Sequence, residues 1–170
     1  MANALRLYLS PVLCFRIFVL FIVLIGVGLS FNHEAAAAEE YNLDQNGTVI
    51  HGYDPVAYFT VGTATQGNPR YAAQHDGVTF NFASEENMTT FMSDPAHYAP
   101  AYGGWCSYGV RVGKKFNTDP NAWKIVDERL YLQLDQGTQL IWAKDLEKNI
   151  EIADRLWPSL KPTPASILGK

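Results

Sequence analysis

Four polar residues have side chains that could take part in chemistry: His51, Asp54, His97 and Cys106. Cys106 follows a Gly-Gly pair and has aromatic neighbours on both sides, within the run Asp94–Gly113. The glycines leave room around the thiol, and a thiolate beside an imidazole can bind a soft or borderline transition metal. The pattern therefore predicts a small metal site at Cys106, completed by His51 or His97, for an ion such as copper.

Each of these residues also has a structural interpretation. Asp54 precedes Pro55, and an Asp-Pro pair is a typical start of a helical turn, so its carboxylate is expected to cap that turn. His97 can be a surface residue or pack against aromatic rings, and Cys106 can be a buried thiol that behaves as a small apolar side chain. These interpretations stay open beside the metal site.

Two further functions remain open from the residues alone. In a thiol enzyme, Cys106 would be the nucleophile and a histidine the base, which requires a lowered thiol pKa. In a binding module, aromatic residues would line a pocket for an organic ligand or a protein partner, and they would otherwise form the core; these are Tyr53, Tyr58, Tyr102 and Trp105. No catalytic residue is assigned, because the sequence favours a non-enzymatic protein.

Charge and motifs exclude several classes of function. The net charge is −4 and no basic cluster offsets it, which argues against nucleic acid or an anionic lipid surface as a partner. The sequence contains no phosphate-binding loop, no Ser-His-Asp order and no Cys-x-x-Cys or His-Glu-x-x-His pattern.

The first 38 residues are typical of a secretory signal peptide. Arg6 and Arg16 precede the uncharged apolar run Ile17–Phe31, and small residues follow up to Ala38. We expect cleavage after Ala38 and a periplasmic or secreted protein that has no further contact with the membrane. An uncleaved anchor is the alternative, because apolar residues begin upstream of the run.

Export changes what the cysteines can do. Cys14 leaves with the signal peptide, so Cys106 is the one cysteine of the mature chain and cannot form an internal disulfide. It is then an inert buried thiol, a metal ligand, or a reactive thiol that could join two chains into a homodimer. Removal of residues 1–38 takes away two arginines and one glutamate, which leaves the mature protein more acidic.

Local patterns predict the elements that position these residues. A short strand is expected at residues 48–51. A hairpin is then expected, because residues 71–75 and 78–82 flank Asp76-Gly77 and alternate apolar residues follow that turn. Ser84 is a typical N-cap for a helix that ends near Ser93.

The C-terminal part repeats the mixture of strands and helices. Residues 123–126 and 130–134 predict two strands, and apolar spacing predicts one long helix from Thr138 to Trp157, stopped by Pro158. Residues 158–170 are expected to be a flexible tail. The fold class is α+β, with a small antiparallel sheet, short helices and one long C-terminal helix. Asp-Pro pairs recur at unequal intervals, which indicates repeated turn signals rather than a sequence repeat.

An ordered set of motifs resembles the YHS domain, and in particular its free-standing, exported form. The motifs are Asp54-Pro55-Val56, the hairpin that ends in Phe80–Phe82, Ser84-Glu85-Glu86, Phe91, Asp94-Pro95 and Tyr98, with Gly52–Phe59 and Tyr102–Cys106 typical of the exported form. The resemblance covers residues 42–115, and the hairpin and helix that follow resemble an extension of the same domain, which would span residues 39–157. It implies an association with metals, loosely with copper.

The chain departs from the family pattern where metal-binding relatives carry cysteine. At these positions it has Ala57, Ala83 and Asn87. A zinc site made of several cysteines is excluded, because the thiolates are absent. The resemblance therefore leaves Cys106, His51 and His97 as the predicted metal ligands.

Overall fold

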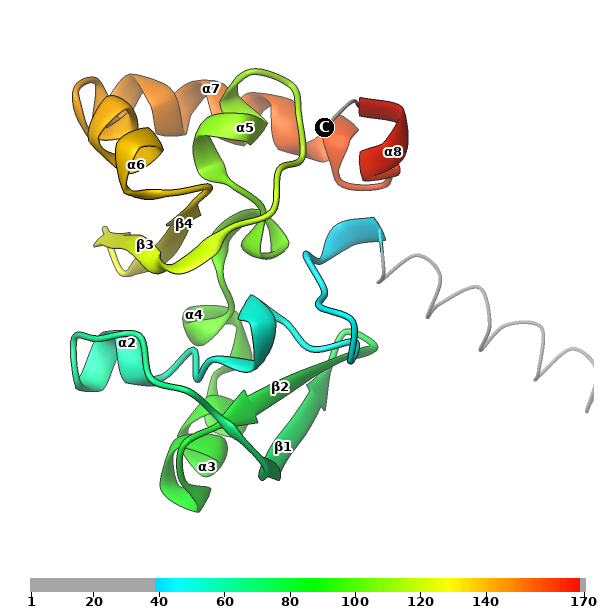
Figure 1. Cartoon of the computed structure of the whole chain (residues 1–170), viewed down its shortest axis with the longest axis vertical. Helices are drawn as coiled ribbons and strands as arrows, with labels where there is room; N and C mark the ends of the chain where they lie inside the picture. Colours follow the sequence, from blue (N-terminus) through cyan, green and yellow to red (C-terminus); the bar gives the residue numbers. More distant parts are fainter. Residues whose placement is uncertain (1–38, 169–170) are drawn as a thin grey trace, which may run out of the picture. The chain divides into compact units, whose positions relative to one another are not determined.

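The structure, a computed structural model, describes residues 39–168. Four strands form two antiparallel hairpins: β1 (Asn68–His75) with β2 (Val78–Phe82), and β3 (Asp119–Val126) with β4 (Arg129–Gln133) (Figure 1). Two short 3-10 turns, η1 (Ile50–Gly52) and η2 (Ala101–Gly104), precede them. The α-helices are α2 (Ala57–Thr60), α3 (Glu85–Ser93), α4 (Pro95–Tyr98), α5 (Ser107–Arg111), α6 (Gln136–Ala143), α7 (Leu146–Leu160) and α8 (Ala165–Leu168). The predicted α+β class is confirmed, although the strands pair as two separate sheets.

The first hairpin and its helix form as the local sequence predicts. β1 and β2 meet at the Asp76-Gly77 turn, where both residues have positive φ. The side-chain oxygen of Ser84 accepts a hydrogen bond from the backbone of Asn87 and starts α3. Phe91 of α3 is buried and packs on Phe80 of β2, with 4.7 Å between the ring centroids.

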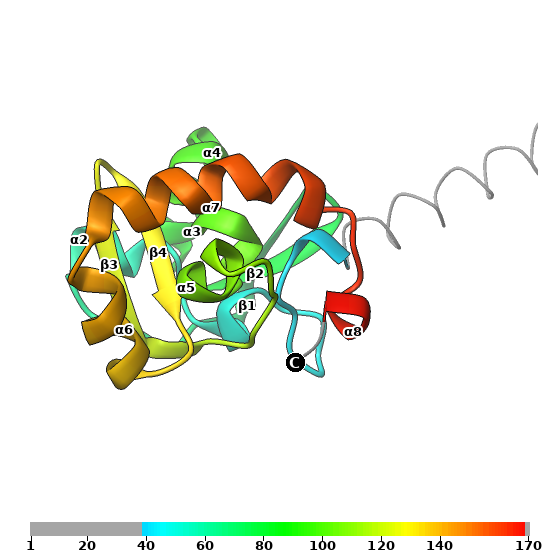
Figure 2. The same ribbon diagram turned by 90° about the horizontal axis from the view of Figure 1, so that it is seen from above.

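The second hairpin divides the interior into two apolar clusters. Leu130 and Leu132 of β4 are buried in the cluster that contains the first hairpin, whereas Tyr131 between them lies in a second cluster under α6 and α7. Successive side chains of a strand point to opposite faces, so β4 serves both clusters. α7 packs along α5, and both helices contribute residues to this second cluster (Figure 2).

The predicted long C-terminal helix is present as α7, but its predicted start at Thr138 is wrong. The structure has two helices, because α6 ends at Ala143 and α7 begins at Leu146. The side-chain amide of Asn149 donates to the carbonyl of Trp142 at 2.8 Å, a carbonyl that a continuous helix would pair with its own backbone. This side-chain bond stabilises the break.

The predicted stop at Pro158 is also wrong, because α7 continues through it to Leu160. Residues 158–168, expected as a flexible tail, form the end of α7, a turn and α8. The ammonium group of Lys115 donates hydrogen bonds to the carbonyls of Lys161 and Thr163 at 3.0 and 2.9 Å. It also donates to the carbonyl of Glu39, so this one buried side chain joins both ends of the described chain.

The strand predicted at residues 48–51 is replaced by isolated bridges and a turn. Thr48 pairs with Thr79 through a single parallel bridge, and η1 follows at once. Ile50–Gly52 have φ angles of 54°, 53° and 78°. This left-handed conformation is unfavourable for Ile50 and His51, so the surrounding packing must hold it.

The same run of left-handed residues occurs again at η2. Tyr102–Gly104 have φ angles of 55°, 60° and 82°, and they lie 52 positions after Ile50–Gly52. In each turn the next backbone N–H returns to the first carbonyl: Tyr53 donates to Ile50 at 3.0 Å, and Trp105 donates to Tyr102 at 3.1 Å. The two turns therefore share their backbone geometry and their hydrogen bonding.

The hairpins that follow the two turns also match. The strand register shifts after Asn68 in the first hairpin and after Asp119, 51 positions later, in the second. At both positions the side chain accepts a hydrogen bond from the backbone two residues on: Asn68 from Arg70 at 3.0 Å, and Asp119 from Asn121 at 2.9 Å. The strand irregularity and the bond that accompanies it are both repeated.

Aromatic packing completes the match. Phe80 and Phe91 stack with planes 37° apart, and Tyr131 and Trp142, again 51 positions later, stack with planes 40° apart. We call residues 48–98 the first repeat and residues 100–160 the second repeat. The Asp-Pro pairs do not recur at the spacing of this structural repeat. Their interpretation as separate turn signals is therefore compatible with the repeat.

Candidate functional site

Cys106 is fully buried at the start of α5. Its sulfur accepts a hydrogen bond from the backbone N–H of Gly109 at 3.4 Å and lies 3.5 Å from the side-chain oxygen of Gln133. Burial raises the pKa of the thiol above its ordinary value, although hydrogen bonds from the surrounding backbone oppose the shift. A thiol with no exposed surface and a raised pKa is poorly suited to nucleophilic attack or to joining two chains.

Asp54 has the equivalent place in the first repeat, 52 positions earlier. One carboxylate oxygen accepts hydrogen bonds from the backbone of Val56 and Ala57 at 2.8 and 3.3 Å, which confirms the predicted cap. The other accepts from the backbone of Ala83 at 2.8 Å and from the amide of Asn87 at 2.6 Å. Like Cys106, Asp54 joins a short helix to the residues after a hairpin.

The three positions that depart from the YHS pattern in the predicted resemblance, Ala57, Ala83 and Asn87, meet at this carboxylate. Ala57 and Ala83 donate to it through the backbone, and Asn87 donates through its side chain. Three sequence positions that are far apart therefore surround one point, but in this chain they present N–H groups rather than thiolates. Asp54 is buried and saturated with hydrogen bonds, so it acts as a structural centre of the first repeat.

His97 lies among aromatic rings. It is the third residue of α4, and its ring centroid is 5.0 Å from that of Phe59 and 4.6 Å from that of Tyr98. Within residues 39–168, no group of three or more His, Cys, Asp or Glu side chains is placed to hold a metal ion. Cys106 and His97 line neither of the two pockets described below, whereas His51 lines one of them.

The pocket at His51 is lined mostly by polar residues of the first repeat and of the segment before it. Its volume is about 460 Å³, and we call it the His51 pocket. Its walls come from η1, the segment before it and the first hairpin: Asp44, Asn46, Thr48, His51, Gly52, Gln66, Gly67, Pro69, Ala72, Thr79 and Asn81. Gly52 marks the point where its polar groups converge, because a Cβ there would lie within 3.5 Å of Gln66 Nε2, Asn81 Nδ2 and Thr48 Oγ1.

Asp44 supplies a carboxylate to this pocket. Its oxygens accept hydrogen bonds from the backbone of Asn46 at 2.8 Å, the backbone of Thr48 at 2.9 Å and the hydroxyl of Thr48 at 2.7 Å. Burial would raise the pKa of this carboxyl, but the bonds from Thr48 and Asn46 outweigh it and lower the pKa below 3.8. Asp44 is therefore ionised at neutral pH, and no lysine or arginine lines the pocket.

Asn81 is the buried polar side chain of the pocket. The residue is 6% exposed, and its amide nitrogen faces the space beside Gly52. The unpaired polar atom at this pocket is Nε2 of His51, which is buried without a partner in the described residues. Buried polar atoms are normally paired, since an unpaired one loses its bonds to water without replacement. Nε2 of His51 is therefore the group here that lacks a partner within the fold.

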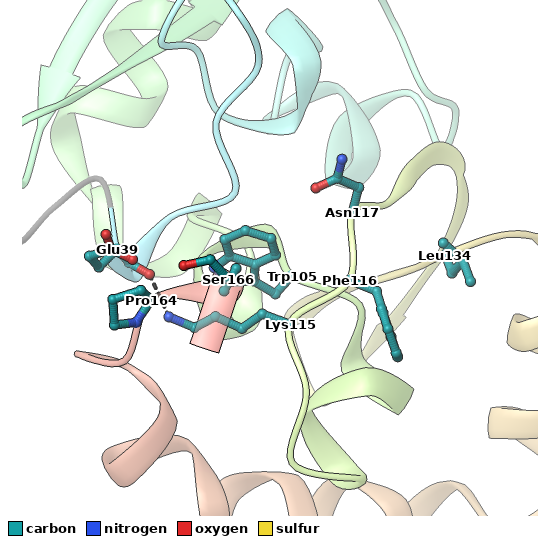
Figure 3. Close-up of a pocket in the computed structure, with 9 residues that line it drawn as sticks. Glu39, Trp105, Lys115, Phe116, Asn117, Leu134, Pro164 and Ser166 are labelled. Carbon is teal, nitrogen blue, oxygen red and sulfur yellow. Dashed lines mark hydrogen bonds between the residues drawn. The ribbon is translucent and has the colours of Figure 1, made fainter. Parts of the chain in front are cut away.

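A second pocket, of about 510 Å³, lies beside Trp105 (Figure 3). Figure 3 shows the side chain of Lys115, one of its lining residues, directed at Glu39 and Pro164. The Lys115 ammonium is satisfied by three carbonyls and lies 5.6 Å from the Trp105 ring and 5.5 Å from that of Trp157. Because this lysine has no free donor for a ligand, we assign it a structural role.

The predicted aromatic-lined pocket is represented by one of its four residues. Tyr58 and Tyr102 are buried and donate through their hydroxyls to the carbonyl of Pro120 and to Asp154, both at 2.9 Å. Tyr53 packs against the first apolar cluster, and Trp105 alone lines a pocket. The aromatic residues are mainly core residues, because each ring contributes a large apolar surface.

Sequence reasoning identified His51 but missed the residues around it. Asp44, Gln66, Thr79 and Asn81 carry no motif that points to a site. One signal was available: Thr79 and Asn81 alternate with the apolar residues of β2, so they had to lie on its other face. The sequence could not show that residues 44–48 and Gln66 border the same face.

Comparison with protein-family models, curated proteins and solved structures found no match to this chain. The YHS resemblance stays a prediction from the motifs. Across the described residues, no helix is both long and apolar enough to cross a membrane. The predicted signal peptide, residues 1–38, lies outside the described part of the chain.

Proposed function

We propose that this protein is a non-enzymatic binding protein that holds a small polar molecule in the His51 pocket. The observation that carries the proposal is Nε2 of His51, which is buried without a hydrogen-bond partner in the described residues and belongs to a residue that lines the His51 pocket. Small-molecule sites are usually preformed concave spaces with a few converging polar groups. The pocket lacks the aromatic lining predicted for such a module, and its ligand is therefore expected to be polar. Export to the periplasm or outside the cell remains part of the proposal and rests on residues 1–38.

A binding experiment with small probes tests this function. Methylamine, ethylene glycol and acetamide are titrated into 15N-labelled protein, purified as the cell processes it, and backbone amide shifts are followed by NMR. We expect saturable shifts at Gly52, Gln66, Gly67 and Asn81 for at least one of these molecules. Shifts that are absent from these residues for all three, or that spread evenly over the surface, would contradict the proposal.

A pair of variants adds a control. Asn81→Leu removes a carboxamide that lines the pocket, and leucine is the residue that β4 carries at the equivalent position, Leu132. Losing a hydrogen-bonding group of the pocket wall should weaken binding about tenfold or more. Asn117→Leu, an exposed asparagine of the second repeat, should leave affinity unchanged. Equal affinities in both variants would remove Asn81 from the site.

Copper binding is the second candidate, and the YHS resemblance supports it. Its ligands would be Cys106 with His51 or His97. Titration of the protein with Cu(I) and Cu(II), repeated with Cys106→Ala, tests it directly. Because Cys106 is buried and its thiol contacts Gln133 and Gly109, we expect the same affinity in both proteins. A clear loss of affinity in Cys106→Ala would instead favour the copper site over the His51 pocket.

A further inference from the structure

The pocket beside Trp105, which we call the Trp105 pocket, has walls from two parts of the chain. One part is the second repeat, whose apolar residues at this pocket are Trp105, Phe116 and Leu134. The other part is the C-terminal end of the described chain, where three consecutive residues line the same space: Pro164, Ala165 and Ser166. We call residues 161–168 the C-terminal strap. The pocket has this shape only while the strap stays in its place.

The C-terminal strap has few contacts of its own with the rest of the fold. α8 has no buried residue, and Ile167 is 73% exposed. Ala165 and Leu168 pack against the second apolar cluster, but both remain partly exposed. In the described part of the chain, residues 164–168 form hydrogen bonds with one another and none with other elements. A segment with so little buried surface and so few outside bonds is among the first parts of a protein to open.

One buried side chain holds the strap at its start. The ammonium group of Lys115 donates to the carbonyls of Lys161 and Thr163 and to the carbonyl of Glu39, a bond that Figure 3 shows. Lysine has three N–H donors, and here they meet three carbonyls. Lys115 is 1% exposed, and within residues 39–168 it forms no ion pair. Its charge is stabilised by these carbonyls and by two tryptophan rings.

A lysine held in this way favours a closed strap without locking it. A charged group is costly to bury, and an ammonium that loses its carbonyls when the strap moves gains bonds to water instead. The carboxylate of Glu40 adds a second contact at the same junction, because it pairs with Lys161 at 2.6 Å. Both side chains of this pair are partly exposed, so the pair contributes little by itself. Lys115 is therefore the main contact that decides whether the strap is closed.

From these contacts we propose that the C-terminal strap is a lid over the Trp105 pocket, and that Lys115 is the latch that holds this lid to Glu39. In the closed state Trp105 is 8% exposed. Opening the lid removes one wall of the pocket and makes the Trp105 ring accessible to small molecules. The lid is separate from the His51 pocket, because no residue of the strap lines that pocket.

A pair of lysine variants tests the latch. Lys115→Met keeps an apolar side chain of similar length and removes the ammonium group. Lys114→Met is the matched control, because Lys114 is the adjacent residue and forms none of the three latch bonds. Native-state hydrogen exchange is followed by NMR at the amides of Thr163 and Ile167, which lie in the strap. We expect exchange there to become about tenfold faster or more in Lys115→Met and to stay unchanged in Lys114→Met.

The amide of Val110 separates opening of the lid from a general loss of stability. Val110 is buried, and its amide donates to the carbonyl of Cys106 at 2.9 Å. Its exchange should change much less in Lys115→Met than exchange in the strap. If Lys115→Met does not fold, the unmodified protein decides, because a lid must open without global unfolding. Strap amides that exchange as slowly as Val110 in the unmodified protein would overturn the proposal, and so would equal acceleration at Val110 and in the strap.

Access to the pocket is measured directly at Trp105. The protein is labelled with 5-fluorotryptophan, a neutral nitroxide is added, and broadening of each 19F signal is recorded, with Trp105 assigned from Trp105→Phe. We expect Lys115→Met to increase the broadening at Trp105 about threefold or more and to leave that of Trp142, which is 0% exposed, unchanged. Faster exchange in the strap with no added broadening at Trp105 would show that the strap moves without covering the pocket, and would overturn the lid.

Discussion

The two repeats share a backbone but differ in what covers their turns. In the second repeat, η2 is covered by residues 40–42, which pack closely against Gly103. In the first repeat, Gly67 and Gln66 donate to the carbonyl of Gly52, while His51 borders the pocket. The chain covers part of both turns, and the difference is that Gly103 admits close contact with residue 40 where the first repeat has His51.

The equivalent faces of the two hairpins also differ, because one is apolar and the other is polar. Leu130 and Leu132 of β4 are buried against the first apolar cluster, while their counterparts on β2, Thr79 and Asn81, line the His51 pocket. The second repeat uses this face for packing, and the first repeat leaves it polar. The equivalent face therefore packs in β4 and lines a pocket in β2, because apolar side chains favour burial and polar side chains need hydrogen-bond partners.

The largest effects are expected at the buried rings that centre the two repeats. Phe91→Ala and Trp142→Ala each remove a ring that is at most 1% exposed, and each should lower the free energy of unfolding by about 3–5 kcal/mol. Because β4 contributes to both clusters, we expect one cooperative transition that shifts in either variant. Urea unfolding followed by tryptophan fluorescence and by circular dichroism measures this. Two transitions, of which only one shifts, would show that the repeats unfold separately.

The next largest effect is expected at Gly103, the glycine of η2 that corresponds to His51 of η1. Gly103→Ala places a Cβ in a left-handed residue and against the Glu40 carbonyl, so it should cost roughly 3 kcal/mol. His51→Gly is the matched change in the first repeat, and relief of the left-handed strain should offset the added freedom of the unfolded chain to within about 1 kcal/mol. Thermal unfolding of both variants checks the comparison. Similar losses would mean that the two turns are covered alike.

Cys106 and Asp54 provide a third, smaller comparison. If both side chains mainly stabilise the start of a short helix, Cys106→Ala should lower stability by about 1–2 kcal/mol. Burial and a raised pKa also predict that iodoacetamide modifies the folded protein far more slowly than the unfolded protein at the same pH. Mass spectrometry of the time course measures this. Rapid modification of the folded protein at pH 7 would indicate an activated thiol and would support a thiol enzyme with Cys106 as its nucleophile.

The smallest effect concerns the charge at the His51 pocket. The folded-state pKa of Asp44 lies below its ordinary value of 3.8, because hydrogen bonds from Thr48 and Asn46 outweigh burial. The carboxylate therefore stabilises the fold above the ordinary value, and this contribution is lost as the pH falls through the lower folded-state pKa. Asp44→Asn should reduce the loss of stability between pH 5 and about pH 2.5. An unchanged pH profile would show that Asp44 is not ionised in this hydrogen-bonded turn.

Several local elements were predictable from the sequence. The Asp76-Gly77 turn, the Ser84 cap and the Asp54 cap depend on residues close in sequence, and the structure has all three. Apolar periodicity predicted one continuous helix over residues 138–157 and missed the break between α6 and α7. That break depends on the side chain of Asn149 rather than on apolar spacing. Of the three predicted metal ligands, His51 lines a pocket, whereas Cys106 is buried at the start of α5 and His97 packs among aromatic rings.

The sequence alone determined the α+β class, the two hairpins and the absence of a multi-cysteine site, because turn residues, strand alternation and residue identity act locally. Only the tertiary structure revealed the repeat, since Ile50–Gly52 and Tyr102–Gly104 share a left-handed backbone but only one identical residue. It also brought Asp44, Gln66 and Asn81 to one pocket. These residues are far apart in the chain, and which face stays open depends on what the rest of the fold covers.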